Sequence, residues 1–365
     1  MVEWKKLGEV CKVHTGSQLN RSDMLEVGPY PVINGGKEYS GYTDKFNENA
    51  NSITISQGGE SAGFVNWVNI SFWAGAHCYV VEIPEGYDSR YLYHTLKNKE
   101  RDIQLSKQGA GIPGLNRDTL YKQVIPIPSL EEQNRIVGIL DTFTSAIDNL
   151  KEQIAQRRKQ YEYYRDQLLD LEGKPGVEMK FITEVAKSFT GLTYKPENVS
   201  DSGTLVLRSS NINDDVLSFD DNVFVQMEIP ERARVQENDI LICVRNGSKR
   251  IVGKVAMITK EAEGMAFGAF MTILRSFAIN SKFLFYVWQS EKVRRQYKGD
   301  EAMPIAQITA KDFQRIVIPV PPLSEQQRIV SILDAFEASI QNLEAQLKER
   351  EKQYEYYRNK LLTFE

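Results

Sequence analysis

The sequence predicts an α+β fold in which two β-rich domains are separated by two long helices with a coiled-coil period, as an internal repeat. A long segment occurs twice, each copy has the apolar spacing of a coiled-coil helix, and strand-like runs between glycine turns precede each copy. These observations divide the chain into a first β-rich domain (residues 1–128), a central helical spacer (129–172), a second β-rich domain (173–321) and a C-terminal helical spacer (322–365).

The repeated segment begins at Pro126 and again at Pro319. Both copies read Pro-x-Pro-x-Leu-x-Glu-Gln, continue through Arg-Ile-Val and close on Gln-Tyr-Glu-Tyr-Tyr-Arg. One shift of 193 residues (319 − 126) relates the two copies without a gap. A long, ungapped internal repeat indicates duplicated architecture.

Each copy is predicted to form one helix of roughly forty residues, about 60 Å long. Apolar and aromatic residues recur at steps of four and three, which average about 3.5 residues, the period of a coiled-coil seam. A lone helix with one apolar stripe is unstable in water, so the copies are expected to pair with each other or with another subunit. The seam residues are Ile136, Leu140, Phe143, Ile147, Leu150, Ile154, Tyr161, Tyr164 and Leu168, and then Ile329, Leu333, Phe336, Ile340, Leu343, Leu347, Tyr354, Tyr357 and Leu361.

Arg157 and Arg350 occupy the same position in the two seams. A charged seam residue can fix the register of a coiled coil at some cost in stability. The alternative is that each arginine lies along its helix and extends its charged end to water.

Both helices have predicted start signals. Ser129 with Glu132 and Ser324 with Gln327 fit capping boxes. The prolines just upstream of each serine exclude helix and favour extended backbone.

Short apolar runs between glycine turns predict a β-rich first domain. Strands are expected at residues 10–16, 31–36, 51–56, 62–67 and 78–83. A helix is expected at 89–97 and a flexible polar loop at 107–114. Asn116 or Asp118 is expected to cap a short helical turn before the strand that leads into Pro126.

The second domain begins like the first, because Glu184–Gly191 matches Glu9–Gly16 at a shift of 175 (184 − 9). The helices shift by 193, so the second domain has about eighteen more residues between the shared ends. Strands are expected at 204–208, 239–244, 254–258 and 270–274, and a helix at 282–288. The framework is therefore repeated while the domain interiors differ.

Composition bounds the class of protein. The 365 residues suit two globular domains plus the helices, and the net charge of −4 argues against a sequence-independent nucleic-acid coat without excluding a local basic face. The three cysteines, Cys11, Cys78 and Cys243, indicate a reducing cytosol. No apolar run of about 18 residues and no signal-peptide core occur, so a cytoplasmic protein without a membrane helix is expected.

No motif for catalysis is present. The sequence lacks a Gly-x-x-x-x-Gly-Lys-Ser/Thr phosphate loop, a dinucleotide fingerprint and a His-Glu-x-x-His motif. Cys11, His14, His77 and Cys78 include zinc-binding atoms, but His77 and Cys78 are adjacent on one strand and point to opposite faces. No catalytic residue, metal site or cofactor of this chain is therefore predicted.

Polar and basic residues on the predicted loops are the candidate DNA-binding groups. Arginine can bridge guanine and asparagine or glutamine can bridge adenine, while lysine, serine and backbone amides suit phosphates. The densest cluster, Arg245–Arg250, also fits a solvated hairpin turn, because Asn-Gly is a common hairpin dipeptide. The candidates are Asn34, Gly35, Gly36, Lys37, Ser56, Gln57, Ser61, Trp67, Lys107 and Gln108 in the first domain, and Arg208, Ser209, Ser210, Asn211, Arg245, Asn246, Ser248, Lys249 and Arg250 in the second.

Over essentially its full length the chain resembles the specificity (S) subunit of Type I restriction–modification enzymes. The Pro-x-Pro-x-Leu-x-Glu-Gln-x-x-Ile segment at Pro126–Ile136 and Pro319–Ile329 carries the resemblance most specifically. Further similar segments are the domain starts Leu7–Val10 and Ile182–Val185, each leading to Thr-Gly, together with Tyr30–Gly36 and Asn238–Ile242.

The resemblance implies two target recognition domains, each reading one half of a bipartite site in double-stranded DNA. It implies that the two long helices form an antiparallel coiled coil, related by a pseudo-two-fold repeat, which sets the spacer. It also implies that the helices dock two modification (methyltransferase) subunits, which restriction (translocase/endonuclease) subunits join. S-adenosylmethionine, ATP and Mg²⁺ would belong to those partners, and this chain would be non-catalytic. The chain is short for the family.

Tyr163 and Tyr356 are the candidate partner-binding residues, because they lie beside the seam rather than in it. Extra aromatic residues there indicate a wider bundle with partner helices, or cover for the flank of the same helix pair. Two rival functions remain: the recognition subunit of another restriction class with a split site, and a coiled-coil scaffold that does not bind DNA.

Overall fold

The computed structural model describes residues 2–107, 114–297 and 306–364. The chain forms two compact units of mixed α and β structure. Unit 1 comprises Met1–Gln153 and Leu343–Glu365, and unit 2 comprises Ile154–Asn342. Each of the two long helices, α5 (Leu130–Leu169) and α9 (Leu323–Leu362), therefore contributes one part to each unit.

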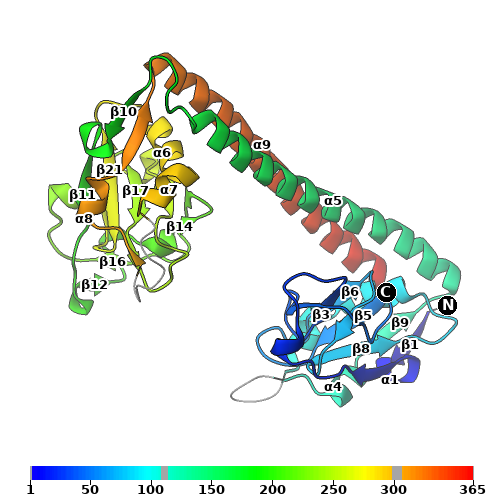
Figure 1. Ribbon diagram of the computed structural model, residues 1–365. Coiled ribbons are helices and arrows are strands. Elements are labelled where there is room, and N and C mark those ends of the chain that lie inside the picture. The colour runs from blue at the N-terminus through cyan, green and yellow to red at the C-terminus, as the bar shows by residue number, and fades with distance from the viewer. Residues whose placement is uncertain (1, 108–113, 298–305, 365) are drawn as a thin grey trace. The chain divides into compact units, whose positions relative to one another are not determined.

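Unit 1 is built on an antiparallel sheet with the strand order β2-β8-β5-β6, and a second sheet has the order β4-β3-β7. The red C-terminal part of α9 lies beside the first sheet (Figure 1). The globular elements are β1 (Glu3–Lys6), α1 (Leu7–Val10), β2 (Lys12–Thr15), η1 (Arg21–Asp23), β3 (Tyr30–Ile33), β4 (Gly41–Thr43), β5 (Ser52–Ser56), β6 (Val65–Val68), β7 (Trp73–Ala74), β8 (Cys78–Glu82), α2 (Ser89–Asn98), α3 (Glu100–Leu105), α4 (Arg117–Tyr121) and β9 (Val124–Ile127).

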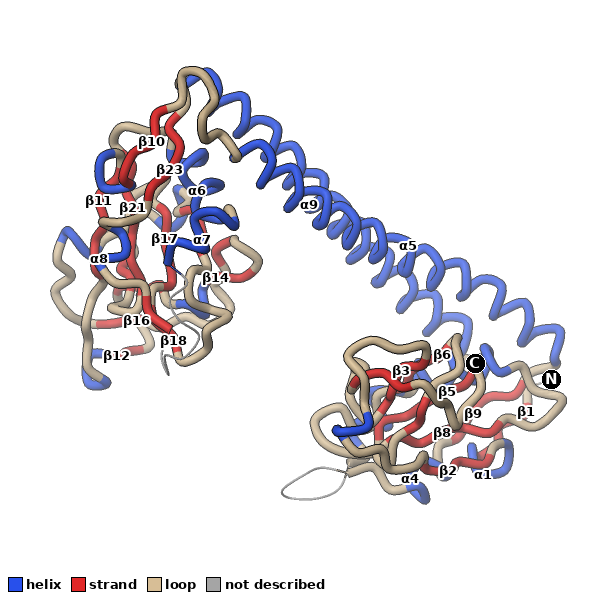
Figure 2. Tube along the Cα trace, viewed as in Figure 1, coloured by secondary structure: helices blue, strands red, loops and turns tan. Residues whose placement is uncertain are grey.

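Unit 2 repeats this plan with the antiparallel sheet β11-β21-β17-β19, whose strands β11, β21 and β17 stand side by side in Figure 2. Its globular elements are β10 (Glu178–Phe181), η2 (Ile182–Glu184), β11 (Ala186–Thr190), η3 (Pro196–Asn198), β12 (Val199–Ser200), β13 (Thr204–Leu207), η4 (Ser209–Asn211), β14 (Ile212–Asn213), β15 (Val216–Leu217), β16 (Phe224–Val225), η5 (Glu231–Ala233), β17 (Ile240–Cys243), β18 (Arg245–Asn246), β19 (Val255–Met257), η6 (Lys260–Ala262), β20 (Ala266–Phe267), β21 (Met271–Ser276), α6 (Ser281–Gln289), α7 (Glu291–Tyr297), β22 (Ala306–Gln307), α8 (Ala310–Phe313) and β23 (Val317–Val320).

The repeat extends to strand pairing. The ribbon β1–β9 has its counterpart in β10–β23, and the parallel pair β3–β7 has its counterpart in β13–β20. The hairpin β14–β15 lies in the longer connection between β13 and β17, where unit 2 has additional residues. The prediction of two repeated domains with long helices is confirmed at this level.

The strand predicted at residues 10–16 begins later than expected. Leu7–Val10 forms the short helix α1, which buries Leu7 and Val10, and the strand starts at Lys12. The Glu9 carboxylate accepts a hydrogen bond from the Lys6 backbone N–H (2.8 Å) and so closes the first turn. Four residues are too few for the helical period to show in the sequence.

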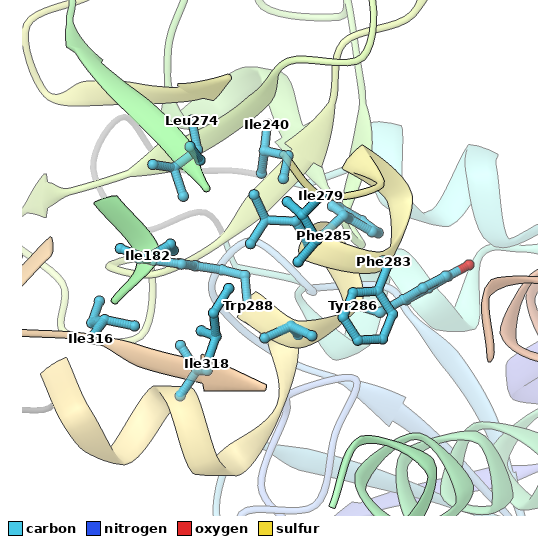
Figure 3. Close-up of a cluster of buried hydrophobic side chains, with 14 of the residues drawn as sticks. Ile182, Ile240, Leu274, Ile279, Phe283, Phe285, Tyr286, Trp288, Ile316 and Ile318 are labelled. Carbon is cyan, nitrogen blue, oxygen red and sulfur yellow. The ribbon is translucent and has the colours of Figure 1, made fainter. Parts of the chain in front are cut away.

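Apolar residues of the long helices complete the core of each unit. In unit 1, Ile136 and Leu140 of α5 and Leu362 of α9 belong to the same buried cluster as Leu92 of α2. In unit 2, Trp288 of α6 lies with Ile182 and Ile318 in the corresponding cluster (Figure 3), which also contains Leu333 of α9. The globular part and its helical part therefore share one core in each unit.

The two helices begin at equivalent positions of the repeat, but with different caps. The Ser129 hydroxyl accepts from the Glu132 backbone N–H (3.4 Å), as the first capping box predicts. The second capping box is wrong, because α9 starts at Leu323 and Ser324 already lies inside the helix. The counterpart of Ser129 is Pro322, whose carbonyl accepts from the Glu325 N–H (2.9 Å).

A buried glutamine joins each helix start to the globular part of its unit. Gln133 donates from Nε2 to the Pro128 carbonyl (2.9 Å) and accepts at Oε1 from the backbone N–H of Asp88 (3.0 Å), the N-cap of α2. Gln326 makes the same pair of bonds to Pro321 (2.8 Å) and to Asn280 (2.9 Å), the N-cap of α6. The Gln of the repeated motif thus positions one helix against another in each unit.

Among the described residues, no helix combines the length and the apolar character that a membrane crossing requires.

Candidate nucleic-acid interface and partner surface

Four segments of unit 2 meet at one end of its sheets, and we call this end the tip of unit 2: the residues after β13, the residues after β17, the turn 268–270 and β22. The Asn246 side chain donates to the Ser209 hydroxyl (3.3 Å), which joins the first two segments. The backbone N–H of Arg245 donates to the Phe270 carbonyl (3.2 Å), and Arg245 pairs with Gln307 in β22. The fold therefore brings together loops that lie far apart in the sequence.

The tip of unit 1 has the same construction, with the residues after β3, the residues after β5, the turn 75–77 and the segment that enters α4. The Asn34 side chain accepts from the His77 backbone N–H (3.3 Å), and the Gln57 N–H donates to the His77 carbonyl (2.9 Å). The Leu115 N–H donates to the Gln57 carbonyl (2.7 Å). The two tips are equivalent in backbone and different in side chains.

In unit 2 most predicted DNA-binding residues lie at the tip, and one is buried. Arg245 is exposed, and the turn after it presents Ser248, Lys249 and Arg250 to solvent. Asn211 is wrong as a reading group, since its side chain is fully buried, accepts from the Arg208 N–H (2.9 Å) and donates to the Ser218 carbonyl (3.0 Å). It holds the loop that presents Ser209 and the exposed Ser210.

Arg208 also lies at this tip, but its charge is paired. Its guanidinium contacts the Asp221 carboxylate (2.9 Å), and a second bond reaches the Asp221 carbonyl (3.3 Å). One nitrogen of the Arg208 guanidinium is therefore already bonded within the tip.

In unit 1 the predicted residues divide between the tip and other places. Asn34, the buried Gly35, the exposed Gly36 and Lys37, and Gln57 lie on the tip segments. Gly35 has φ +88°, and a Cβ there would lie 2.8 Å from the His77 carbonyl oxygen, so the turn requires glycine.

Two of the residues predicted in unit 1 lie in strands and not in loops. Ser56 is buried in β5, and Trp67 lies in β6 opposite Ile53, toward the other end of β5 from Ser56. The Trp67 ring packs against Tyr93 of α2 and under the Arg90 guanidinium, 4.6 Å from the ring centroid. Both side chains thus serve packing inside the unit.

Ser61 and Lys107 lie near each other at the turn between β5 and β6. Ser61 is half-buried in the turn between these strands, and the Lys107 ammonium donates to the Glu60 carbonyl (2.9 Å) beside it. Gln108 lies outside the described residues.

The sequence analysis missed Phe270 and His77, which occupy the same place in the two tips. Each is the third residue of a Gly-Ala-x turn, and the turns are related by the 193-residue shift of the helices (268 − 75). Both side chains are exposed. The repeated Gly-Ala pair, immediately before a strand, is the signal that could have found them.

Cys11, Cys78 and His14 are occupied by burial or hydrogen bonding within unit 1. Burial raises the pKa of Cys11 and Cys78 to about 12, so both thiols are neutral. His14 is hydrogen-bonded to Glu48 (2.8 Å). Across the ranges that the structure describes, no cluster of three metal-ligating side chains occurs.

Within each unit the parts of α5 and α9 run antiparallel and contact each other through stacked aromatic rings. In unit 1, Phe143 stacks on Tyr357 (5.2 Å between ring centroids), and Arg350 lies 5.8 Å from the Phe143 centroid. In unit 2, Phe336 stacks on Tyr164 (5.6 Å), and Arg157 lies 5.9 Å from the Phe336 centroid. Each seam arginine thus lies over an aromatic ring of the opposite helix.

Tyr163 and Tyr356 are both 59% exposed and lie beside these stacks. Each meets its neighbouring tyrosine edge-on, at 5.3 Å between centroids. Each also lines a groove, of about 600 Å³ in unit 2 and about 550 Å³ in unit 1. The unit 2 groove is lined by Lys159, Glu162, Tyr163, Asp166, Gln167, Leu169, Asp170, Ser290, Glu291 and Lys292, and the unit 1 groove by Phe143, Glu349, Arg350, Lys352, Gln353, Tyr356 and Tyr357.

A polar network also fixes the globular part of unit 1 to the helices. The His94 ring is fully buried and bonds to Asp141 of α5 (2.8 Å) and to the Tyr354 hydroxyl of α9 (2.9 Å). In unit 2 the counterpart of His94 is Tyr286, whose hydroxyl donates to Asp334. Both networks hold the globular part of a unit at a defined orientation to its own helical part.

A family model described as the Type I restriction modification DNA specificity domain matches residues 1–157 and 175–351. The chain belongs to this family. It is a specificity subunit of the Type I restriction–modification class, as the repeated Pro-x-Pro-x-Leu-x-Glu-Gln segment indicated.

The relatives span the whole chain. A putative type I restriction enzyme specificity subunit of Haemophilus influenzae is 26% identical, over 100% of this chain and 96% of its own length. The EcoR124I/EcoR124II specificity subunit of Escherichia coli is 28% identical, over 100% of this chain and 94% of its own. The solved type I S subunit from M. genitalium has the same fold, with a TM-score of 0.61, 20% identity and coverage of 100% and 97%.

Proposed function

We propose that this specificity subunit reads a bipartite DNA site, with the tip of each unit contacting one half. The observation that carries the proposal is that the two tips share a backbone framework and differ in their exposed side chains. A common frame allows both tips to approach duplex DNA in the same way, and different side chains allow them to select different base sequences.

In this proposal, the second half-site is read by a basic and amide-bearing surface. Arg245 and Asn246 lie where the tip segments converge, and Lys249 and Arg250 follow in the same turn. Arginine and asparagine suit base edges, and lysine suits phosphates. The first half-site falls to Asn34, Lys37 and Gln57, which gives that tip a more amide-rich surface.

The helices act in this proposal as an antiparallel coiled coil that sets the spacer between the half-sites. Each contains 40 residues, which corresponds to about 60 Å of helix. The buried glutamines and the networks at His94 and Tyr286 support a fixed spacing, because they leave the globular parts little freedom to turn on the helices.

Two modification (methyltransferase) subunits would dock on the helical parts, at the grooves beside Tyr163 and Tyr356. Two equivalent surfaces in one chain favour two copies of the same partner. Restriction subunits would join this assembly, and S-adenosylmethionine, ATP and Mg²⁺ would act on the partners, with this chain contributing sequence choice alone.

Genome-wide mapping of methylated adenines, with and without the gene for this chain, tests the proposal. The expected result is a split motif that is methylated in the parent, lost on deletion and restored by the intact gene. An unchanged methylation pattern on deletion would contradict the proposal and favour the scaffold function.

A further inference from the structure

We infer that Arg245 reads a base edge in the second half-site and that Phe270, on the Gly-Ala-Phe turn, is the positioning residue that holds its guanidinium. This inference rests on the proposed function of the tips. It adds a residue that the polar candidates did not include and assigns it a role through Arg245.

The two side chains form a pair at the tip of unit 2. The Arg245 guanidinium lies 5.4 Å from the centroid of the Phe270 ring, within the range of a cation–π contact. Phe270 is 58% exposed, so the pair faces solvent. The ring thus supports the guanidinium without withdrawing it from an incoming duplex.

Arg245 differs from two other arginines of unit 2, Arg208 and Arg275, in what its guanidinium contacts. Arg208 contacts the Asp221 carboxylate (2.9 Å), and Arg275 contacts the buried Asp239 (2.7 Å). No carboxylate pairs with Arg245 in the part of the chain that the structure describes. An aromatic ring restricts an arginine while leaving its five N–H donors available, whereas a carboxylate takes up one or two of them and offsets the charge.

The backbone holds Arg245 and Phe270 together. The Phe270 carbonyl accepts from the N–H groups of both Val244 (3.0 Å) and Arg245 (3.2 Å). The turn itself is closed by the Met271 N–H, which donates to the Gly268 carbonyl (2.9 Å). A guanidinium fixed in this way loses less conformational entropy on binding than a free one.

The turn packs closely on the Thr-Gly end of β11. A Cβ at Gly191 would lie 2.1 Å from the carbonyl oxygen of Gly268, so this approach requires glycine. Unit 1 repeats the contact, since a Cβ at Gly16 would lie 2.2 Å from the Ala74 carbonyl oxygen. Both units therefore fix the Gly-Ala-x turn, while its third residue differs between Phe270 and His77.

An exposed phenylalanine by itself carries no function, because single apolar side chains are common on protein surfaces. Phe277 provides the matched case: it is also 58% exposed and follows the opposite end of β21. No cation–π pair with Phe277 occurs among the described residues, and its backbone N–H bonds to Val185, away from the tip. Comparing Phe270 with Phe277 therefore distinguishes a specific effect on Arg245 from a general effect of removing an exposed aromatic ring.

The experiment uses the full chain co-expressed with its modification subunits and DNA carrying the mapped site or one of its single-base variants. Methylation rates are measured for wild type, Arg245→Ala, Phe270→Ala, Phe270→Tyr and Phe277→Ala, with thermal unfolding as a check on folding. Arg245→Ala is expected to lower discrimination at one base pair of one half-site about tenfold or more. Phe270→Ala is expected to relax the same base pair several-fold, and Phe270→Tyr to retain discrimination because it keeps the ring.

Several results would overturn the inference. Phe270→Ala could match Phe277→Ala, or it could relax a different base pair from Arg245→Ala. Its effect could also persist undiminished in the Arg245→Ala background, which would mean that it does not act through that arginine. A wild-type complex without sequence-specific methylation would instead refute the proposed function, and this inference with it.

Discussion

Gln133 and Gln326 show why one residue type fits the repeated motif. Each amide donates to a carbonyl with Nε2 and accepts from a backbone N–H with Oε1, while almost wholly buried. A glutamate could accept from the N–H but would place a carboxylate oxygen against the carbonyl. An apolar residue would leave both backbone groups without a partner.

Gln326→Ala is therefore expected to lower the free energy of unfolding by about 1–3 kcal/mol, because it leaves the Asn280 N–H and the Pro321 carbonyl unpaired. Gln327→Ala is the control, since that side chain is exposed on the same helical turn and should change stability by less than about 0.5 kcal/mol. Urea unfolding followed by circular dichroism measures both. Equal stabilities of the two variants would mean that the buried bonds do not stabilise the helix start.

His94 is held neutral in its network. Burial lowers its pKa below the ordinary value, against the opposing effect of Asp141. A carboxylate can only accept, so Nε2–H donates to Asp141 and Nδ1 accepts from the Tyr354 hydroxyl. Burial opposes ionisation of Asp141, but hydrogen bonds from His94 and Arg90 outweigh it and lower the pKa of Asp141 to about 2.

The lowered pKa of His94 makes the stability of unit 1 depend on pH. The folded pKa of His94 is lowered, so the unfolded chain binds the proton more readily and stability falls as pH drops below about 6.5. Asp141 contributes in the same direction only at lower pH, as pH falls toward about 2. Between about pH 7 and pH 5, wild type is expected to lose more thermal stability than His94→Gln. Calorimetric scans at both pH values measure the difference, and equal losses would show that His94 does not titrate in that window.

The individual reading residues were the part of the site that sequence predicted least well. Loop composition indicated the exposed Arg245 and the half-buried Asn246, which both lie at the tip, but Asn211 is buried and Trp67 lies in a strand. The Asn211 side chain is hydrogen-bonded within its own loop, and the Trp67 ring packs under the Arg90 guanidinium. Tertiary contacts of this kind leave no local sequence signal.

At the scale of elements, periodicity predicted both long helices and their seam, because a repeat of this length averages out local exceptions. It did not place the start of α9, where Ser324 suggested a cap that the fold does not use. Tertiary bonds to Gln326 fix that start, and the Pro322 carbonyl replaces the missing hydroxyl. Each seam arginine lies over a phenylalanine ring of the opposite helix, and Arg350 is also exposed, in keeping with the alternative that its charged end extends to water.

The exposed tyrosines give a prediction about the helical surface. Tyr163→Ser together with Tyr356→Ser should reduce the amount of modification subunit that co-purifies with this chain, because each change removes an aromatic wall of a groove. The helices should keep their stability, since both side chains are exposed. Quantitative co-purification from cells that express all subunits measures the effect.

Tyr39→Ser is the control for this pair, as Tyr39 is 49% exposed on the globular part of unit 1. Co-purification of the double variant at the level of Tyr39→Ser would exclude these tyrosines from the partner surface. The alternative that the two residues cover the flank of their own helix pair would then stand.

At the scale of the whole molecule, the two units share their framework and differ in the exposed residues of their tips. Strand pairing, the Gly-Ala turns, the buried glutamines and the aromatic stacks recur in both units. The exposed residues on the tips do not recur, as Phe270 and His77 illustrate. On the proposed function, such a subunit would change its target by altering a few tip residues while its helices stay constant.

The net charge of −4 bears on the affinity of the isolated chain for DNA. Phosphate contacts by lysine and arginine supply much of the affinity of DNA-binding proteins, and this chain has more acidic than basic residues. From the acidic balance we expect weak binding by the chain alone and a gain of at least about 100-fold when the modification subunits add phosphate contacts. The gain should shrink as salt rises from about 50 to 200 mM, because the added contacts release counterions. Fluorescence anisotropy with a duplex carrying the mapped site measures both species, and a salt-tolerant nanomolar complex of the isolated chain would contradict this expectation.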